Sequence, residues 1–380
     1  MSNKRLLKMN PHTKAKHTIL EHYLKGWFPI MSKFNGRIIY LDGFAGSGIY
    51  DSGDFGSPVI ALRVAKEHVL QDMMLKGEKG FYFVEKDHAR FSTLNSVLTE
   101  QFGPWGGVNN LDALPQNFKV NVSEGDFNKE IKDILDSIEV HGTNLAPTFA
   151  FVDPYSYSLD LSLLSRIIAY PKCEVLFTFM VGFLDRFVFA EEHIDAITRT
   201  FCIDKSKIER IRTIENKDER DEYLGSMLVN LLKGRLSAHD NLYWLSFKMI
   251  DKHNNIMYWL MFFTKSVKGM EVMKSSMFDI CRQGDYTFSD FNFSPDQTSI
   301  LDYSDGTEQW VLNAADYLSR QLLGKQMQIN DIKTYVTLYT PYVYKAKILK
   351  ELEGKDKIRV QYAKNRRLGS YPDGCSVEFL

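Results

Sequence analysis

A glycine-rich turn follows the first short apolar run of this 380-residue chain. Residues 37–41 are mostly β-branched and apolar, and residues 42–48 then read Asp-Gly-Phe-Ala-Gly-Ser-Gly. Glycines let a backbone turn tightly and approach a ligand, and a carboxylate accepts hydrogen bonds from cationic or hydroxylated groups. The turn predicts a small-cofactor site formed by Asp42, Phe44, Gly46 and Gly48. A purely structural turn between a strand and a helix is the alternative.

Two further polar positions follow later apolar runs. Glu85 ends the second run, where an acidic residue can grip ribose hydroxyls, although it could also be a solvated loop charge. Asp126 and Phe127 follow the third run and could read and cover an adenine. Asp126 could instead only cap the next helix. These positions favour a cofactor that contains a nucleoside.

The sequence Asp153-Pro154-Tyr155 follows the fourth apolar run. Chemistry at an exocyclic amine needs an acceptor that holds the amino hydrogens and leaves the nitrogen lone pair free to attack. Asp153 and the region of Pro154 could supply that acceptor, and Tyr155 could stack on a planar base. Positioning in a dry pocket would do most of the remaining work. An Asp-Pro turn that merely closes a strand is the alternative.

Basic residues near the amino terminus form another candidate group. Lys14, Lys16 and His17 precede the apolar residues of the first helix and could contact a carboxylate of the cofactor or the substrate. A solvated helix end is equally compatible with them. The nine histidines show no paired ligand spacing, so we expect no metal site. Neither a phosphate-binding P-loop nor a G-x-S-x-G motif is present.

The apolar runs alternate with helical patterns. Strands are predicted at 37–41, 80–85, 118–122, 148–153 and 174–179, with helices at 13–31, 59–75, 88–101, 127–139 and 159–170. This alternation predicts a doubly wound, mostly parallel α/β sheet of the Rossmann-like kind. Functional residues should then lie at the carboxyl ends of the strands, where all the candidates above occur.

The remaining sequence predicts an insertion, a hairpin and a second domain. Residues 184–235 are helical and charged, and they could form a lid or substrate wall. Residues 243–250 and 256–264 flank a turn and predict an antiparallel hairpin. We expect a first domain over 1–283, a linker over 284–306 and a second domain over 307–380.

The carboxyl-terminal part has the pattern of a winged helix. Helices are predicted at 309–323, 329–338 and 342–352, and short β runs at 357–362 and 376–380. Its basic residues include Lys345, Lys347, Lys350, Arg366 and Arg367. A basic recognition helix and wing suit the phosphates of RNA or DNA, but winged helices also dock proteins. Both kinds of partner stay open.

Composition limits the class of protein. Hydrophobic residues make up 44% and charged residues 25%, which excludes a disordered or collagen-like chain. The net charge of -1 provides no general attraction for a polyanion, so nucleic acid would have to bind a local patch. The four cysteines are widely spaced, and no apolar run reaches the length of a signal peptide or membrane span. We therefore expect a cytoplasmic protein with reduced thiols and no membrane contact.

Taken together, six motifs resemble the three-Cys-motif partner (TcmP) family. They are residues 16–20, 40–48, 56–58, 83–87, 151–155 and 268–274, which span nearly the whole chain. The resemblance implies a class I methyltransferase-like fold, a turn that binds the methyl donor S-adenosylmethionine, and a separate three-cysteine partner that itself resembles radical S-adenosylmethionine proteins. In such folds an antiparallel hairpin ends the sheet, which distinguishes them from dinucleotide dehydrogenases.

The pair Lys16-His17 and the sequence Asp153-Pro154-Tyr155 are also similar to bacterial ribosomal RNA adenine-N6 methyltransferases, whose motif carries a second proline that is absent here. The leading hypothesis is therefore an S-adenosylmethionine-dependent methyltransferase acting on an amino group of a nucleobase in RNA or DNA. The rival is a noncatalytic scaffold that docks the three-cysteine partner. A nicotinamide-dependent oxidoreductase is disfavoured because the turn lacks Gly-x-Gly-x-x-Gly.

Overall fold

The computed structural model describes residues 6–107, 109–154, 159–201, 203–251, 253, 255–281, 286–289, 306–361, 367 and 369–380. Tyr155 and Arg366, both named above as candidate functional residues, lie outside the described residues. No helix in the described part of the chain is long and apolar enough to cross a membrane.

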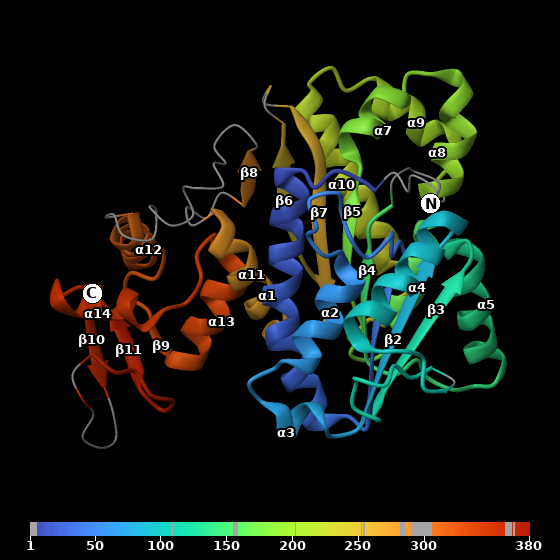
Figure 1. The fold of residues 1–380 in the computed structure, drawn as a ribbon. Coiled ribbons are helices and arrows are strands. Elements are labelled where there is room, and N and C mark those ends of the chain that lie inside the picture. Colours follow the sequence, from blue (N-terminus) through green and yellow to red (C-terminus); the bar gives the residue numbers. More distant parts are fainter. Residues whose placement is uncertain are drawn as a thin grey trace.

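An eight-stranded sheet forms the centre of the molecule (Figure 1). Its spatial order is β3-β2-β1-β4-β5-β7-β6-β8, and every neighbouring pair is parallel except the two pairs made by β7. The strands are β1 (Arg37–Asp42), β2 (Glu78–Glu85), β3 (Phe118–Glu124), β4 (Thr148–Val152), β5 (Glu174–Phe179), β6 (Tyr243–Ile250), β7 (Ile256–Thr264) and β8 (Thr287–Ser289). The predicted mostly parallel sheet with an antiparallel hairpin is confirmed.

Helices cover both faces of the sheet, so the core has two apolar layers. On one face lie α1 (Pro11–Phe34), α2 (Ser57–Lys66), α3 (Gln71–Met74), α4 (His88–Phe102) and α11 (Val267–Cys281). On the other face lie α5 (Phe127–Val140), α6 (Leu161–Ala169) and α10 (Lys217–Lys233). Alternate residues of a strand point to opposite faces, so each central strand contributes to both layers.

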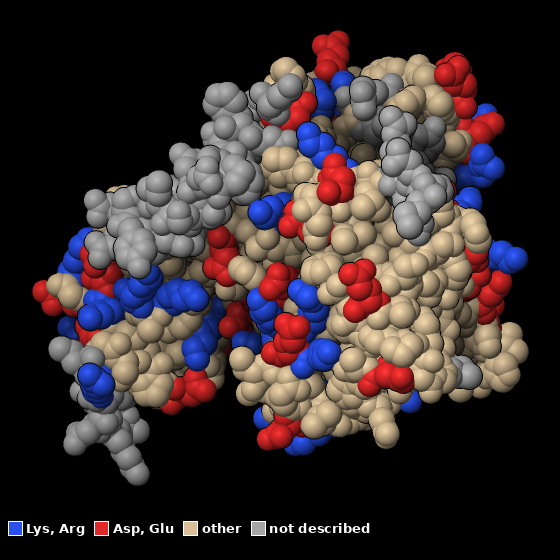
Figure 2. Space-filling model, viewed as in Figure 1, with Lys and Arg blue, Asp and Glu red and all other residues tan. Residues whose placement is uncertain are grey.

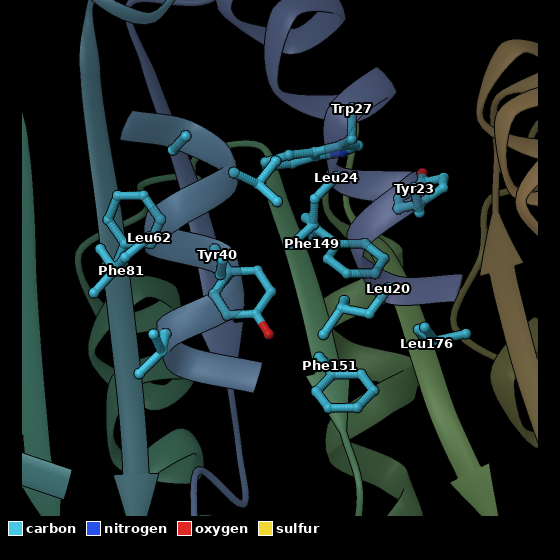
Figure 3. Packing of buried hydrophobic residues seen from close by; sticks show 14 of the residues in the cluster. Leu20, Tyr23, Leu24, Trp27, Tyr40, Leu62, Phe81, Phe149, Phe151 and Leu176 are labelled. Atoms are coloured by element: carbon cyan, nitrogen blue, oxygen red, sulfur yellow. The ribbon is translucent and has the colours of Figure 1, made fainter. Parts of the chain in front are cut away.

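The first layer is rich in aromatic rings. Leu20, Tyr23 and Trp27 of α1 lie over Tyr40 of β1 and Phe149 of β4 (Figure 3). The rings of Tyr23 and Phe149 are 4.8 Å apart, and those of Trp27 and Phe149 are 5.9 Å apart. Each such side chain contributes about 1.5–3 kcal/mol on burial. This packing fixes the long helix α1 against the sheet and so positions the polar residues near its amino end.

Helices occupy the segment between β5 and β6, where the sequence predicts a helical insertion over 184–235. It comprises α7 (Val181–Phe187), a 3-10 turn (Glu191–His193), α8 (Ile194–Phe201), α9 (Lys205–Arg212) and then α10. Figure 1 shows α7, α8 and α9 together at the top of the view, beyond the end of β5. Their apolar residues join the second layer of the core, so the insertion is packed onto the main fold.

The single helix predicted over 59–75 was wrong, because the chain breaks between α2 and α3. His68 is only 8% exposed and sits in this break. Its Nδ1 accepts a hydrogen bond from the backbone N–H of Leu70 at 3.0 Å, and its Nε2 lies 2.9 Å from the carbonyl oxygen of Lys25. The imidazole thus holds the chain in a turn against α1.

The carboxyl-terminal elements form a separate apolar cluster at the left of Figure 1. They are α12 (Gly306–Gln321), β9 (Gln326–Gln328), α13 (Ile329–Tyr339), α14 (Ala346–Gly354), β10 (Ile358–Gln361) and β11 (Ser376–Phe379). The strands make an antiparallel sheet in the order β10-β11-β9. Strand β9 was not among the predicted elements, and β8, inside the expected linker, pairs with β6 of the main sheet.

A buried lysine joins the two parts of the chain. Lys274 of α11 is 2% exposed and donates to the carbonyl oxygens of Val336, Thr337 and Thr340 at 2.7, 2.9 and 2.6 Å. These carbonyls lie at the carboxyl end of α13, where the last turn of a helix leaves acceptors unpaired. Burial lowers the pKa of Lys274 to about 7. Lys274 therefore caps α13 from a helix of the main fold.

We expect Lys274→Met to reduce the free energy of unfolding by about 3 kcal/mol, because three buried carbonyls lose the Lys274 donor. The carbonyl of Val336 still accepts from the Thr340 hydroxyl at 2.8 Å, so most of the loss comes from Thr337 and Thr340. Urea unfolding followed by circular dichroism measures this loss, and hydrogen exchange should increase in α13. Lys268→Met is the control, since Lys268 lies on the same helix with its side chain 56% exposed. Equal stability of the two variants would contradict the capping role.

Candidate functional site

The predicted glycine turn lies between β1 and α2 and is held by three strands. Gly43 N–H donates to the carbonyl of Phe151 at 3.0 Å, and Ala45 N–H donates to that of Val84 at 2.9 Å. Gly46 and Gly48 have φ angles of 64° and 72°, in the left-handed region that favours glycine. A Cβ added at Gly46 would meet no atom within 4 Å, so the backbone there borders open space.

Glu85 holds the same turn from the end of β2. Its Oε2 accepts a hydrogen bond from Gly46 N–H at 2.8 Å, and its Oε1 accepts one from Asp87 N–H at 2.8 Å. The side chain is buried. A carboxylate has about four acceptor positions, so the geometry allows a hydroxylated ligand to bind Glu85 as well.

Asp42 lies beneath the turn, fully buried at the end of β1. Burial raises the pKa of Asp42 to about 7. Hydrogen bonds from the Ser57 hydroxyl and the Phe44 N–H favour the ionised form and offset part of this rise. The hydroxyl of Tyr40 lies 3.4 Å from Asp42 Oδ2. Near neutral pH this carboxyl is therefore divided between its neutral and charged forms, and a cation beside it would favour the charge.

Asp153, at the end of β4, forms an ion pair with Lys16 of α1. Both side chains are largely buried, with exposed fractions of 21% for Asp153 and 7% for Lys16. Burial alone would raise the pKa of Asp153, but Lys16 keeps that pKa below its usual value. The sequence predicted each residue as a candidate but not their contact. Asp153 is thus held as a carboxylate, with one oxygen engaged by the lysine.

His17, the neighbour of Lys16, is buried beside the turn. Burial and the charge of Lys16 lower its pKa to about 4, so the imidazole is neutral at physiological pH. Its ring lies 5.6 Å from that of Tyr50. Within the described part of the chain no hydrogen-bond partner reaches its buried Nδ1. A buried ring nitrogen without a partner costs free energy unless a ligand or water pairs with it.

We expect the stability contribution of His17 to fall as the pH drops from about 6.5 to 4. In this range the unfolded histidine takes up a proton and the folded one does not, so acid favours unfolding. The full shift corresponds to about 3 kcal/mol. Urea unfolding of the parent and His17→Gln at pH 7.5 and 4.5 measures it, with the exposed His141→Gln as control. An unchanged difference between parent and His17→Gln would contradict the lowered pKa.

Asp126 and Phe127, predicted to contact an adenine, have two different structural roles. Asp126 is the N-cap of α5, where its Oδ1 accepts from Asn128 N–H at 3.0 Å, and its Oδ2 pairs with Lys86 at 3.0 Å. Phe127 is 3% exposed and stacks on Phe44 with ring centroids 5.4 Å apart. Asp126 therefore caps a helix, which was the alternative to a contact with adenine. The ring of Phe44, on which Phe127 stacks, belongs to the turn itself.

A narrow cleft brings several of the predicted residues together. It is lined by Leu7, His17, Phe44, Ala45, Gly46, Ser47, Gly48, Ile49, Tyr50, Gly56, Ser57 and Asp153. Its volume is about 20 Å³, much less than the 300–1,000 Å³ of typical ligand pockets, so a cofactor would have to separate its walls. Asp42 and Glu85 do not line the cleft. They accept hydrogen bonds from backbone N–H groups of the turn, those of Phe44 and Gly46. Asp126 and Phe127 do not line the cleft.

Pro154 lies on the other side of Asp153, in a second small cavity under the helical insertion. This cavity is lined by Pro154, Thr178 of β5, and Leu184, Thr200 and Phe201 of the insertion. The insertion therefore lies beside Pro154, the neighbour of Asp153 in the sequence. A role as a lid or substrate wall stays a prediction. Tyr155 follows Pro154 directly but lies outside the described residues.

Several residues of the site were missed as functional candidates, among them Ser57, Tyr50 and Leu7. Ser57 was included only in the 56–58 motif of the family resemblance, without a role, yet its hydroxyl hydrogen-bonds to Asp42. Tyr50 packs against His17, and Leu7 lines the cleft while its carbonyl accepts from Asp51 N–H at 3.0 Å. Only Ser57 had a sequence signal, the Ser-Pro pair at the start of α2. Leu7 and Tyr50 lie in segments outside helices and strands, where no periodic pattern of apolar residues indicates which side chains are buried.

The charges of the site favour a cationic, hydroxylated ligand. Three carboxyl groups, those of Asp42, Glu85 and Asp153, lie at the ends of neighbouring parallel strands. Lys16 balances one of them, and the nearby His17 is neutral. Opposite charges favour each other most strongly where water is excluded. A sulfonium or ammonium group with ribose hydroxyls matches this set of acceptors.

Comparisons with known proteins report only weak likeness. No protein-family model and no curated protein matches this sequence. Among solved structures, the chain is similar to Trm1 from Pyrococcus horikoshii, solved with S-adenosyl-L-methionine, at 13% identity and a TM-score of 0.37. That alignment covers 70% of this chain and 59% of Trm1. Protein LPL1258 from Legionella pneumophila is similar at 11% identity and a TM-score of 0.36, over 66% of this chain and 85% of its own.

Proposed function

We propose that this protein is an S-adenosylmethionine-dependent methyltransferase that acts on an amino group of a nucleobase in RNA or DNA. The observation that carries the proposal is the glycine turn joined to Glu85 by the 2.8 Å hydrogen bond from Gly46, with Asp153 across the same cleft. A turn with left-handed glycines and an acidic residue after the second strand suits a nucleoside cofactor at the carboxyl edge of a parallel sheet.

The cofactor would be held by residues at the ends of β1 and β2. Glu85 would accept the ribose hydroxyls, Asp42 would favour a positive charge above it, and Phe44 would cover one side. His17, with its orphaned Nδ1, would take a polar group of the amino-acid end. When bound, S-adenosylmethionine supplies an electrophilic methyl group on a positively charged sulfur.

The acceptor would be oriented by Asp153. The ionised carboxylate, kept in that form by Lys16, can accept a hydrogen bond from an amino group and so direct the nitrogen lone pair toward the methyl group. The wall made by Pro154 and the helical insertion would exclude water from the reacting atoms. Positioning of this kind can supply several kcal/mol of the barrier reduction without a metal.

The carboxyl-terminal elements support a nucleic-acid partner. Figure 2 shows Lys and Arg side chains gathered on the surface of this part of the molecule. Exposed basic residues in and around α14 include Lys345, Lys347, Lys350, Lys355, Lys357 and Arg367. We propose that these elements act as a winged helix whose basic face contacts phosphates and presents the nucleobase.

A second candidate function is a noncatalytic scaffold that docks a three-cysteine partner protein. Two observations favour it: the cleft is narrow, and Asp153 already pairs with Lys16. A scaffold would keep the fold and form a stable complex without methylating any molecule.

Transfer of a labelled methyl group distinguishes the two functions. The full chain is incubated with methyl-labelled S-adenosylmethionine and separated fractions of cellular RNA, DNA, protein and metabolites. We expect label in RNA or DNA, and a protein lacking Asp153 serves as the control. Label confined to protein or metabolites would refute the nucleobase assignment, and no label in any fraction would favour the scaffold.

A further inference from the structure

A larger cavity lies at the edge of the sheet opposite the glycine turn. Its volume is about 440 Å³, and it is enclosed by the second half of α1, the start of β5, the end of β7 and the start of α11. Strand β5 begins at Glu174, which lines this cavity, and ends at Phe179. Thr178, near that far end, lines the small cavity beside Pro154. The length of the strand therefore separates this cavity from the proposed catalytic site.

The sides of the cavity formed by α1 and the middle of α11 are largely apolar. Trp27, Ile30 and Met31 of α1 line one side and Val272 of α11 lines another. Phe34, which also lines it, is 68% exposed although it is a large apolar side chain. Lys33 Nζ lies 5.2 Å from the centroid of the Phe34 ring. The cavity volume, and not this single exposed ring, falls within the 300–1,000 Å³ that is typical of ligand pockets.

Lysines surround this apolar wall. Lys172 donates to the amide oxygen of Asn35 at 2.8 Å, and Lys265 donates to two backbone carbonyls at the end of α6 at 3.0 and 2.9 Å. The hydrogen-bond acceptors of both lysines are therefore neutral. Lys268, at the start of α11, pairs with Glu271 at 2.9 Å. An anionic group could thus be met by Lys172 and Lys265 without breaking an ion pair.

Among the described residues that line the cavity, Glu174 carries the carboxyl group, and it is part of the protein framework. Glu174 is 4% exposed and accepts hydrogen bonds from the hydroxyls of Tyr23 at 2.5 Å and Thr264 at 2.6 Å. A Cβ at Gly269 would lie 2.2 Å from its Oε1, so α11 packs directly against it. Burial also raises the pKa of Glu174, which reduces its negative charge. Glu174 therefore joins α1, β5, β7 and α11 and does not form a cation site.

We propose that this cavity binds a small molecule with an apolar body and a terminal carboxylate. The apolar body lies against Trp27, Met31 and Phe34, and the carboxylate lies between Lys172 and Lys265. The volume holds a medium-length acyl chain or a substituted aromatic acid. Binding at this edge is independent of methyl transfer at the opposite edge.

Calorimetric titration of the full chain with sodium decanoate tests the proposal. We expect one saturable site. Decyltrimethylammonium, which has the same chain and the opposite charge, should bind at least tenfold more weakly. Lys172→Glu should weaken decanoate binding at least tenfold by reversing a charge at the site, and Met31→Trp should do so by filling the cavity. Lys129→Glu makes the same charge change on α5, outside the cavity, and should leave the affinity unchanged.

Thermal unfolding and circular dichroism confirm that each variant is folded before its affinity is compared. No decanoate binding by the parent protein would overturn the proposal, and so would equal binding by the parent, Lys172→Glu and Met31→Trp. Equal binding of the anionic and cationic chains would show an apolar cavity without the proposed charge selection, which also contradicts it. If the cavity accepts only a side chain of a protein partner, the parent protein will not bind decanoate, and the proposal is overturned.

Discussion

Asp153→Asn should reduce methyl transfer by at least about a hundredfold while changing the affinity for S-adenosylmethionine by less than about threefold. Removing one preorganised hydrogen-bonding group that acts in the transition state typically costs about 10²–10³ in rate. Asp153 lies across the cleft from the glycine turn, so its loss should affect the acceptor and not the cofactor. Steady-state rates with labelled cofactor measure the first effect, and calorimetry measures the second.

The ion pair with Lys16 complicates this substitution, because it leaves a buried ammonium without its partner. Breaking one side of a buried pair commonly costs about 3–5 kcal/mol of stability. The double variant Lys16→Met with Asp153→Asn removes both charges and should recover much of this stability. It should not recover activity. If the double variant is as active as the parent, Asp153 has only a structural role in pairing Lys16.

Glu85→Ala should raise the dissociation constant of S-adenosylmethionine at least tenfold, which corresponds to about 1.4 kcal/mol. The substitution removes the acceptor of Gly46 N–H and so loosens the turn. It also removes the proposed partner of the ribose hydroxyls. The rate at saturating cofactor should change much less, because Glu85 ends β2, which β1 separates from β4 and Asp153. Calorimetric titration and saturation kinetics measure the two quantities.

Glu124→Ala is the matched control for Glu85. Glu124 ends the neighbouring strand β3, pairs with His88 at 2.9 Å, and is 40% exposed. Its loss should leave cofactor affinity within about twofold of the parent. A similar loss of affinity in both variants would indicate general disturbance of the sheet edge and would contradict a specific role for Glu85.

The order of elements could be predicted because periodicity reports which residues are buried. Strands β1 to β5 are short apolar runs in an alternating series, and such runs appear directly in the sequence. Because Asp42, Glu85 and Asp153 follow or end three of these runs, the sequence predicted that they lie at one edge of the sheet, and the structure places them there. Their assigned chemical roles remain predictions.

Features set by tertiary contacts could not be predicted in the same way. The break after α2 depends on His68 meeting a carbonyl of α1, and local helical periodicity continues through it. The capping of α13 by Lys274 depends on how two distant segments dock. Strand β8 is only three residues long and is fixed by its pairing with β6. The Lys16–Asp153 pair joins residues 137 positions apart, and no sequence spacing reveals it.

Calorimetric titration of the pure protein with S-adenosylmethionine and with S-adenosylhomocysteine is the most direct test of the central claim. The account predicts a saturable single site for each, with affinity lowered at least tenfold by Glu85→Ala and little changed by Asp153→Asn. No measurable binding of either molecule by the folded parent protein would contradict the assignment of the glycine turn as a site for the methyl donor.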